Sequence, residues 1–335
     1  MSRDSEFEAL VKTIAERVHA ELGRQAAPAA AAPSNVTPIG RHHNSPHAHD
    51  ATTRSVTSKT PCKAGKRDCI GCGWSVSRRP DDVRKVIDIG AARISAKADI
   101  DGDSVRADLA PYIDHTLLKA RASRDELRKL CDEARTHRFA SVCVNPSNVG
   151  YCARQLRGSG VPVVAVVGFP LGATTPAAKA FEAREAVREG ATEIDMVINI
   201  GALKSGDYAL VLEDIQKVVE ASRPNKVKVI IETGELERDE KVIASTLSKI
   251  AGAAFVKTST GFGPGGATAE DVMLMKRVVG DELEVKASGG MRTADDVDEM
   301  IQAGATRIGA SASVAIVKGA TRAKDGGSKR AAGGY

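Results

Sequence analysis

The chain has 335 residues, a formal net charge of +5 and 27% charged residues, close to the usage of ordinary globular proteins. Aromatic residues make up only 3%, which argues against a binder that stacks single-stranded nucleic-acid bases, and no long basic run indicates a nucleic-acid partner. Six cysteines are too few for a disulfide scaffold, no apolar run is long enough to span a membrane, and the N-terminus is acidic where a signal peptide is positive. We therefore expect a cytoplasmic protein without a nucleic-acid or membrane partner.

An amphipathic helix is predicted at the N-terminus, within residues 1–23. Its apolar residues recur at steps of three and four positions, at Phe7, Leu10, Val11, Ile14, Val18 and Leu22. Ser5 and Glu8 have the spacing of a capping box, and Gly23 can end the helix.

Residues 24–61 are rich in Ala, Pro, Ser and Thr and have no apolar period, which predicts a flexible linker. A short isolated helix is only marginally stable in water, so its apolar stripe needs a partner surface. Helix and linker together resemble the encapsulation peptides that carry enzymes into bacterial microcompartments. The resemblance implies that residues 5–22 dock on shell proteins and that the protein lies in the compartment lumen. The main alternative is a helix that packs on its own domain; a membrane-surface helix is less favoured, because the polar face carries about as many acidic as basic residues.

Residues 62–104 form a cysteine-containing extension. Cys62, Cys69 and Cys72 lie within eleven positions, and the Cys-x-x-Cys pair can grip one ion from a tight turn. We expect zinc or an iron–sulfur cluster at these three thiols. No fourth cysteine follows nearby, so a linker histidine, a small molecule or another chain would supply the fourth ligand. Redox-active or inert thiols are the alternative.

From residue 105 to 320, short Val- and Ile-rich runs alternate with amphipathic stretches. Strands are predicted at 112–118, 139–144, 161–169, 192–200, 227–233, 253–260, 282–288 and 306–311. Helices are predicted at 123–137, 147–158, 176–189, 207–222, 238–250, 268–279, 293–303 and 311–318. Continuous apolar strands separated by helices indicate a parallel sheet buried on both faces. Eight repeats favour an α/β fold of the (β/α)8 TIM-barrel type, with a doubly wound open sheet as the alternative and residues 321–335 as a flexible tail.

Three of the charged residues in these apolar runs are candidates for chemistry. Asp195 lies inside one predicted strand, and Lys257 and Lys286 lie near the carboxyl ends of two consecutive strands. A structural salt bridge would account for Asp195. Two lysines buried at the same height are hard to explain by packing, since lysine is almost never fully buried.

The lysine pair is suited to imine chemistry. An ordinary lysine has a pKa of about 10.4, and both burial and a neighbouring ammonium disfavour its charged form. We expect Lys257 to attack an aldehyde, Lys286 to depress the pKa of Lys257 and share in proton transfer, and Asp195 to help move protons through water.

Glycine-rich turns follow the last strands, and their N–H groups can hold a phosphate at the carboxyl-terminal face of a barrel. The residues are Gly261, Gly289, Gly290, Gly309 and Ser311. Tight turns without a ligand are the alternative for each one alone.

Four segments together resemble the deoxyribose-phosphate aldolase family: Ile113-Asp-His-Thr-Leu-Leu118, Glu193-Ile-Asp-Met-Val197, Val256-Lys-Thr-Ser-Thr-Gly261 and Val285-Lys-Ala-Ser-Gly-Gly290. The resemblance implies a class I aldolase that needs no metal and reversibly cleaves 2-deoxy-D-ribose 5-phosphate to D-glyceraldehyde 3-phosphate and acetaldehyde. It makes Lys257 the Schiff-base lysine and Lys286 and Asp195 the proton-transfer residues. It also implies substrate contacts by Asp114, Cys143 and Thr258, and phosphate contacts by the glycine turns.

Some positions depart from the family pattern or extend it. Phe262 stands where some members have a lysine, and Ala312 where a second serine is frequent. In some members a terminal tyrosine enters the active site, so Tyr335 is a candidate proton-transfer residue, with a flexible tail as the alternative. We expect a homodimer. Another Schiff-base aldolase, a transaldolase, or a metal-binding interaction or electron-transfer protein that uses the N-terminal region are the alternative functions.

Overall fold

A computed structural model describes residues 105–320 and, near the N-terminus, Thr13, Glu16, Val18, Ala20, Leu22 and Gly23. These six residues are helical, as the apolar period predicts. The chain divides into two compact units, residues 29–101 and the remainder, and residues 29–101 lie outside the described part. The predicted linker, Cys62, Cys69, Cys72 and Tyr335 all lie outside the described residues.

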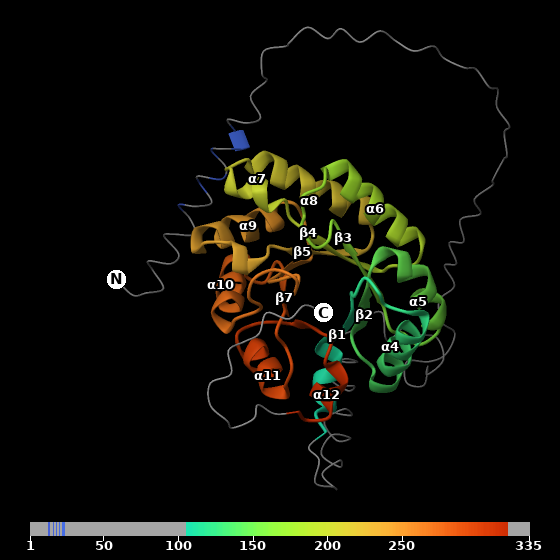
Figure 1. The fold of residues 1–335 in the computed structure, drawn as a ribbon. Coiled ribbons are helices and arrows are strands. Elements are labelled where there is room, and N and C mark those ends of the chain that lie inside the picture. Colours follow the sequence, from blue (N-terminus) through green and yellow to red (C-terminus); the bar gives the residue numbers. More distant parts are fainter. Residues whose placement is uncertain are drawn as a thin grey trace, which may run out of the picture. The chain divides into compact units, whose positions relative to one another are not determined.

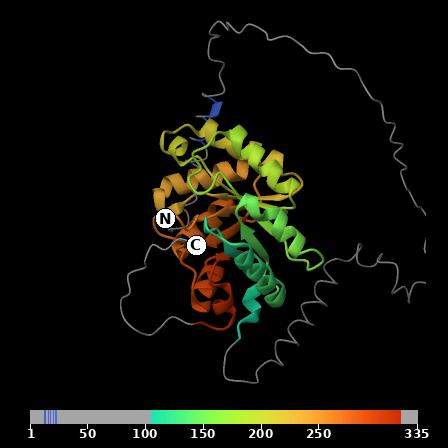
Figure 2. The same ribbon diagram turned by 45° about the vertical axis from the view of Figure 1, so that its right-hand side comes forward.

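Eight parallel strands close into a barrel in chain order, with β1 also paired to β8. The strands are β1 (Ile113–Leu117), β2 (Ser141–Val144), β3 (Val163–Val167), β4 (Glu193–Val197), β5 (Lys226–Ile230), β6 (Phe255–Lys257), β7 (Glu284–Ser288) and β8 (Arg307–Ala310). Figure 1 shows the helices on the outside of this ring of strands, and the turned view in Figure 2 shows the same arrangement. The predicted (β/α)8 barrel is confirmed, and the doubly wound sheet is excluded.

The helices connect successive strands. They are α4 (Arg124–His137), α5 (Val149–Gln155), α6 (Pro176–Arg188), α7 (Ile200–Lys204), α8 (Tyr208–Ser222), α9 (Arg238–Ile250), α10 (Ala269–Val279), α11 (Ala294–Gln302) and α12 (Ser313–Val317), with 3-10 turns η1 (Ala107–Tyr112), η2 (Pro146–Asn148) and η3 (Thr233–Glu235). Polar side chains cap the N-termini of several helices. Before α4, for example, the Ser123 hydroxyl accepts from the Glu126 N–H while the Glu126 carboxylate accepts from the Ser123 N–H.

Local differences from the predicted elements have physical causes. The segment 253–260 forms only the short strand β6, because the chain leaves the barrel after Lys257 to enter a glycine-rich loop. The predicted helix at 147–158 begins as the 3-10 turn η2 at Pro146 and becomes α-helical at Val149. The short α7 and η1 were not predicted, since neither is long enough to show an apolar period.

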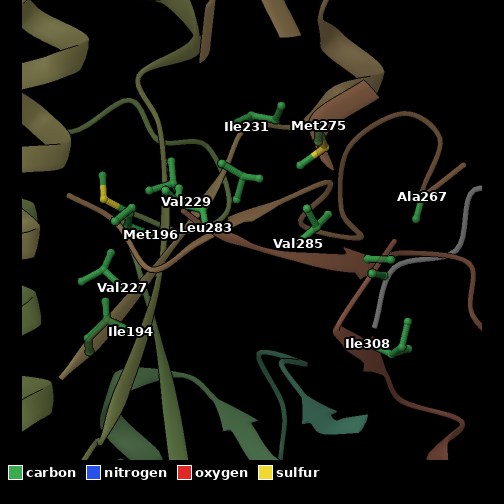
Figure 3. Close-up of a cluster of buried hydrophobic side chains, with 14 of the residues drawn as sticks. Ile194, Met196, Val227, Val229, Ile231, Ala267, Met275, Leu283, Val285 and Ile308 are labelled. Carbon is green, nitrogen blue, oxygen red and sulfur yellow. The ribbon is translucent and has the colours of Figure 1, made fainter. Parts of the chain in front are cut away.

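The main hydrophobic core lies between the strands and the helices. Figure 3 shows Ile194 and Met196 of β4 near Val227 and Val229 of β5, and all four are at most 2% exposed. Val18, from the N-terminal helix, is also fully buried and belongs to the same cluster. Among the described residues, no helix is both long and apolar enough to cross a membrane.

Candidate active site

Successive side chains of each strand point alternately to the helices and into the barrel, and several of those that point inward are charged. On β4, Ile194 and Met196 pack in the outer core, so Asp195 between them faces the interior. The strand register sets Asp195 beside Lys228 of β5, and Lys257 of β6 beside Lys286. All four charged side chains are buried, with at most 2% exposure.

Asp195 lies between three lysines. Its Oδ2 accepts hydrogen bonds from Nζ of Lys257 at 2.9 Å and from Nζ of Lys286 at 2.7 Å. Its Oδ1 accepts one from Nζ of Lys228 at 2.9 Å. Asp195 therefore forms salt bridges, and two of them place two amines on the same oxygen atom. The sequence predicts that Lys257 and Lys286 lie close together, and the structure confirms this.

Asp114 fixes Lys286 from the opposite side. Its Oδ2 lies 2.6 Å from Lys286 Nζ, while its Oδ1 accepts from Arg307 Nη1 at 2.8 Å and from Ser141 Oγ at 2.6 Å. Asp114 is completely buried. Its carboxylate is therefore engaged by the protein's own side chains, and its nearest effect is on the orientation and charge of Lys286.

Glu193 completes the network at the amino end of β4. Its carboxylate binds Arg307 Nη1 at 2.8 Å and Lys228 Nζ at 2.5 Å. Seven side chains thus form one charged cluster, defined here as Asp114, Glu193, Asp195, Lys228, Lys257, Lys286 and Arg307.

The two lysines that share Asp195 have opposite pKa shifts. Burial lowers the pKa of Lys257, and the charge of Lys286 lowers it further, which outweighs the opposing effect of Asp195. Burial also acts on Lys286, but the carboxylates of Asp114 and Asp195 outweigh it and raise the pKa of Lys286 well above its usual range. Such a split assigns different roles to two groups of one kind. Lys257 is suited to act as a nucleophile and Lys286 as a charged proton donor.

The carboxylate between them stays ionised. Burial alone would raise the pKa of Asp195, but Lys228, Lys257 and Lys286 hold it well below its usual range. An ionised Asp195 can stabilise a positive charge that forms at Lys257, and it can orient Lys286.

An apolar wall lies beside these charges. Leu118, Cys143, Val164 and Val166 form a separate buried cluster, and Phe169 packs against it. Burial raises the pKa of the Cys143 thiol to about 11, so the thiol is protonated at neutral pH. Cys143, predicted as a pocket residue, therefore contributes a small neutral surface.

Thr258 braces the ends of two strands. Its hydroxyl donates to the Ser288 carbonyl at 3.1 Å and accepts from the Ser288 N–H at 3.0 Å. The hydroxyl is buried, and these two bonds hold β6 to β7. A substrate contact by Thr258 stays a prediction, because its hydroxyl can accept one more hydrogen bond.

The predicted glycine turns lie at the carboxyl ends of neighbouring strands. Gly261, Gly289 and Gly290 have φ values of 85°, 91° and 84°, which L-residues rarely adopt. Gly309 pairs with Ser288 across β7 and β8, and a Cβ there would lie 2.2 Å from the Ser288 hydroxyl. Backbone conformation thus favours glycine at 261, 289 and 290, whereas Gly309 leaves room for the Ser288 side chain. Ser311 follows β8 and is exposed.

An aromatic pair lies on the loops after β3 and β6. The rings of Phe169 and Phe262 meet edge to face, with centroids 5.3 Å apart. Phe262 is 44% exposed. The residue that stands in the place of a lysine therefore presents an apolar edge to solvent.

Three members of the charged cluster were missed in the sequence: Glu193, Lys228 and Arg307. Lys228 is flanked by Val227 and Val229, so it looks like one polar interruption in an apolar run. Strand alternation could have revealed Lys228, because successive side chains point to opposite faces of a strand. Lys228 lies between two outward-facing valines, just as Asp195 lies between Ile194 and Met196. Within the described residues, no group of three or more His, Cys, Asp or Glu side chains is arranged to hold a metal ion.

Residues 109–322 match the DeoC/LacD family of aldolases. The deoxyribose-phosphate aldolase of Staphylococcus haemolyticus (strain JCSC1435) is 60% identical over 210 residues, which are 63% of this chain and 96% of that protein. A solved structure from Coccidioides immitis is 40% identical, with a TM-score of 0.63 over 69% of this chain and 94% of that chain. The chain belongs to the DeoC/LacD aldolase family. A tetrameric deoxyribose phosphate aldolase from Aeropyrum pernix, 31% identical, has a TM-score of 0.60 over 64% of this chain and 91% of its own.

The range that matches the DeoC/LacD family contains all eight strands and the whole charged cluster. Residues 1–108 lie outside that range. The part of the chain that matches the aldolase family is therefore the barrel.

Proposed function

We propose that this aldolase reversibly cleaves 2-deoxy-D-ribose 5-phosphate to D-glyceraldehyde 3-phosphate and acetaldehyde through an imine on Lys257. The observation that carries the proposal is the pair of buried lysines with opposite pKa shifts on one carboxylate oxygen. The close relative from Staphylococcus haemolyticus, which bears the name of this activity, supports the choice of substrate.

Cleavage begins with the neutral amine of Lys257. It attacks the C1 aldehyde of the open-chain sugar, and loss of water leaves a protonated imine. The C3 hydroxyl then gives up its proton, the C2–C3 bond breaks, and its electron pair moves into the imine to form an enamine. D-Glyceraldehyde 3-phosphate leaves at this point. Because the protonated imine accepts the electrons, this chemistry requires no metal or other cofactor.

The second half returns the enzyme to its starting state. The enamine carbon takes up a proton, water hydrolyses the imine, and acetaldehyde leaves the Lys257 amine. We assign the proton transfers to Asp195 and Lys286 acting through water: the ionised Asp195 takes up the proton of the C3 hydroxyl, the charged Lys286 gives a proton to the enamine carbon, and transfer from Asp195 to Lys286 restores both groups. Asp195 is 2.9 Å from the nitrogen that becomes cationic, a position from which it stabilises the imine electrostatically.

The substrate phosphate is assigned to the glycine turns. Gly261, Gly289, Gly290, Gly309 and Ser311 follow or end neighbouring strands on the carboxyl-terminal side of the barrel, where N–H groups can surround an anion. Cys143 and its apolar neighbours would then line the part of the pocket that takes the hydrocarbon of acetaldehyde.

A substrate panel tests the activity. Purified protein should cleave 2-deoxyribose 5-phosphate and leave ketose phosphates intact, whereas the reverse preference would indicate a transaldolase or another Schiff-base aldolase. Lys257→Ala should abolish cleavage. The matched control is Lys179→Met, because Lys179 is equally buried but pairs with Asp214 outside the charged cluster, and this variant should keep the activity at temperatures where it is folded.

We also propose that Tyr335 enters the active site during turnover, a role supported by the resemblance to members with a terminal tyrosine. Tyr335→Phe should then slow exchange of the acetaldehyde methyl protons with solvent deuterium about 100-fold or more, the lower end of the usual acid–base contribution. An unchanged exchange rate would rule this role out.

For the N-terminus we propose a cytoplasmic protein that docks on microcompartment shell proteins through residues 5–22 and lies in the compartment lumen. The helical conformation of the six described residues there is consistent with this. Burial of Val18 in the chain's own core supports the alternative, so docking would require the helix to be released. Residues 1–23 fused to a fluorescent protein should concentrate on co-expressed shells, and uniform fluorescence would reject the proposal.

We further propose a zinc or iron–sulfur site at Cys62, Cys69 and Cys72, supported by their spacing alone. Metal content of the purified protein should fall in Cys69→Ser, and equal content in both would reject the site. For assembly we propose a homodimer, which light scattering of the full chain tests directly.

A further inference from the structure

The charged cluster contains more cations than anions. Its carboxylates are Asp114, Glu193 and Asp195, and its cations are Lys228, Lys257, Lys286 and Arg307. Three negative charges can compensate only three positive ones. An uncompensated charge in a buried site costs several kcal/mol, so one of the four cationic groups is driven to give up its proton.

The contacts indicate which group that is. Arg307 does not lose its proton in proteins. Lys286 has two carboxylates within 2.7 Å, and Lys228 has Glu193 at 2.5 Å, Asp195 at 2.9 Å and Asp114 at 3.9 Å. Lys257 has only Asp195, through an oxygen that it shares with Lys286. Lys257 is therefore the least compensated amine of the cluster.

We propose that Lys228 is a positioning residue that keeps Lys257 uncharged: it occupies Asp195 and Glu193 with a charge of its own and leaves Lys257 as the surplus amine. Lys228 lies on the far side of Asp195 from Lys257, on Oδ1 and not on Oδ2. It needs no contact with substrate to act in this way. The lowered pKa of Lys257 agrees in direction with this arrangement.

The remaining titratable groups around Lys257 add no ion pair to those of the charged cluster within the described residues. Cys143 faces it from β2 as a neutral thiol. Glu232, on the loop after β5, accepts from the Thr260 N–H at 3.1 Å and forms no ion pair within the part of the chain that the structure describes. Burial raises the pKa of Glu232 and outweighs the opposing effects of the Thr260 hydrogen bonds and the charge of Lys257, so Glu232 compensates Lys257 less than Asp195 does. Lys226 and Glu284 neutralise each other at 3.3 Å, where both side chains are about half exposed.

The inference rests on the proposed role of Lys257 as nucleophile, and its test is the variant Lys228→Met. With one cation removed, three carboxylates face three cations, so Lys257 can stay protonated. The rate of borohydride trapping of acetaldehyde on Lys257 rises with pH as the amine loses its proton. In Lys228→Met the midpoint pH of this increase should be higher by about one unit or more. The trapping rate at pH 7 should then fall at least about tenfold and recover in alkaline buffer.

Two further variants separate charge from packing. Lys228→Arg keeps the positive charge and should leave the pH dependence near that of the parent, whereas a shift as large as in Lys228→Met would overturn the proposal. Arg307→Met removes a different cation that does not touch Asp195, and it should also raise the midpoint pH of trapping. If Lys228→Met does not fold, the shift in Arg307→Met tests whether the charge count sets the protonation of Lys257.

The control is Lys179→Met, which removes an equally buried lysine from an ion pair with Asp214. It should lower thermal stability without moving the pH dependence of trapping. An unshifted Lys228→Met with an intact circular dichroism spectrum would overturn the role of Lys228. Absence of any Lys257 adduct in the parent protein would instead overturn the proposed function, so the two failures are distinguishable.

Discussion

Phe262 lies on the loop after β6, in a place where some aldolases of the family have a lysine. Its ring is 44% exposed and contacts Phe169 edge to face. Phe262→Lys should lower the KM for 2-deoxyribose 5-phosphate roughly two- to tenfold, because an ammonium at the site mouth attracts the phosphate. Cleavage of unphosphorylated 2-deoxyribose should stay unchanged. A matched effect on both sugars would mean that the change acts through packing against Phe169.

At the same scale, the residues proposed as catalytic could be predicted because charged side chains are rare in buried apolar strands. Lys257, Lys286 and Asp195 stand out in apolar strands, and the structure brings all three together. Arg307 and Glu193 were missed because they lie at the first positions of β8 and β4, where a charged residue normally marks the edge of a strand. The bonds of Thr258 to Ser288 could not be predicted, because they depend on which strand lies beside β6, and the sequence does not display this.

At the scale of elements, a buried ion pair joins α6 to α8. Lys179 and Asp214 are both fully buried, and Lys179 Nζ also donates to the Val197 carbonyl at the end of β4 at 2.8 Å. Asp214→Asn removes the compensating charge and should lower the free energy of unfolding by about 3–5 kcal/mol, measured by urea denaturation.

The comparison for Asp214→Asn is Glu284→Gln, which breaks the half-exposed pair with Lys226. Solvent screening makes such pairs worth about 1 kcal/mol or less. Equal losses in both variants would contradict the view that burial decides the value of an ion pair in this barrel.

Long elements could be predicted and short ones could not. Helices such as α8 and α9 bury one face, so their apolar period is visible, and the alternation of eight Val- and Ile-rich runs indicated the barrel. The strand β6 has three residues because the active-site loop begins directly after Lys257. Its predicted length was wrong because the buried residues Thr258, Ser259 and Thr260 belong to the loop after β6 and not to the strand.

At the scale of the whole molecule, the match to the family covers residues 109–322 and leaves the N-terminal part outside. Removal of residues 1–100 should change kcat/KM by less than about twofold, since no cluster residue lies there. The melting temperature should fall, because Val18 leaves the hydrophobic core. Loss of activity in a folded truncated protein would instead place part of the active site in the N-terminal region.

The nucleophile is the central claim, and borohydride trapping with acetaldehyde tests it most directly. Reduction fixes the imine as a secondary amine, and peptide mass mapping locates it. The account predicts one adduct on Lys257 in the intact protein and none in Lys257→Ala. An adduct on Lys286, or no adduct at all, would contradict the assignment of the two lysines.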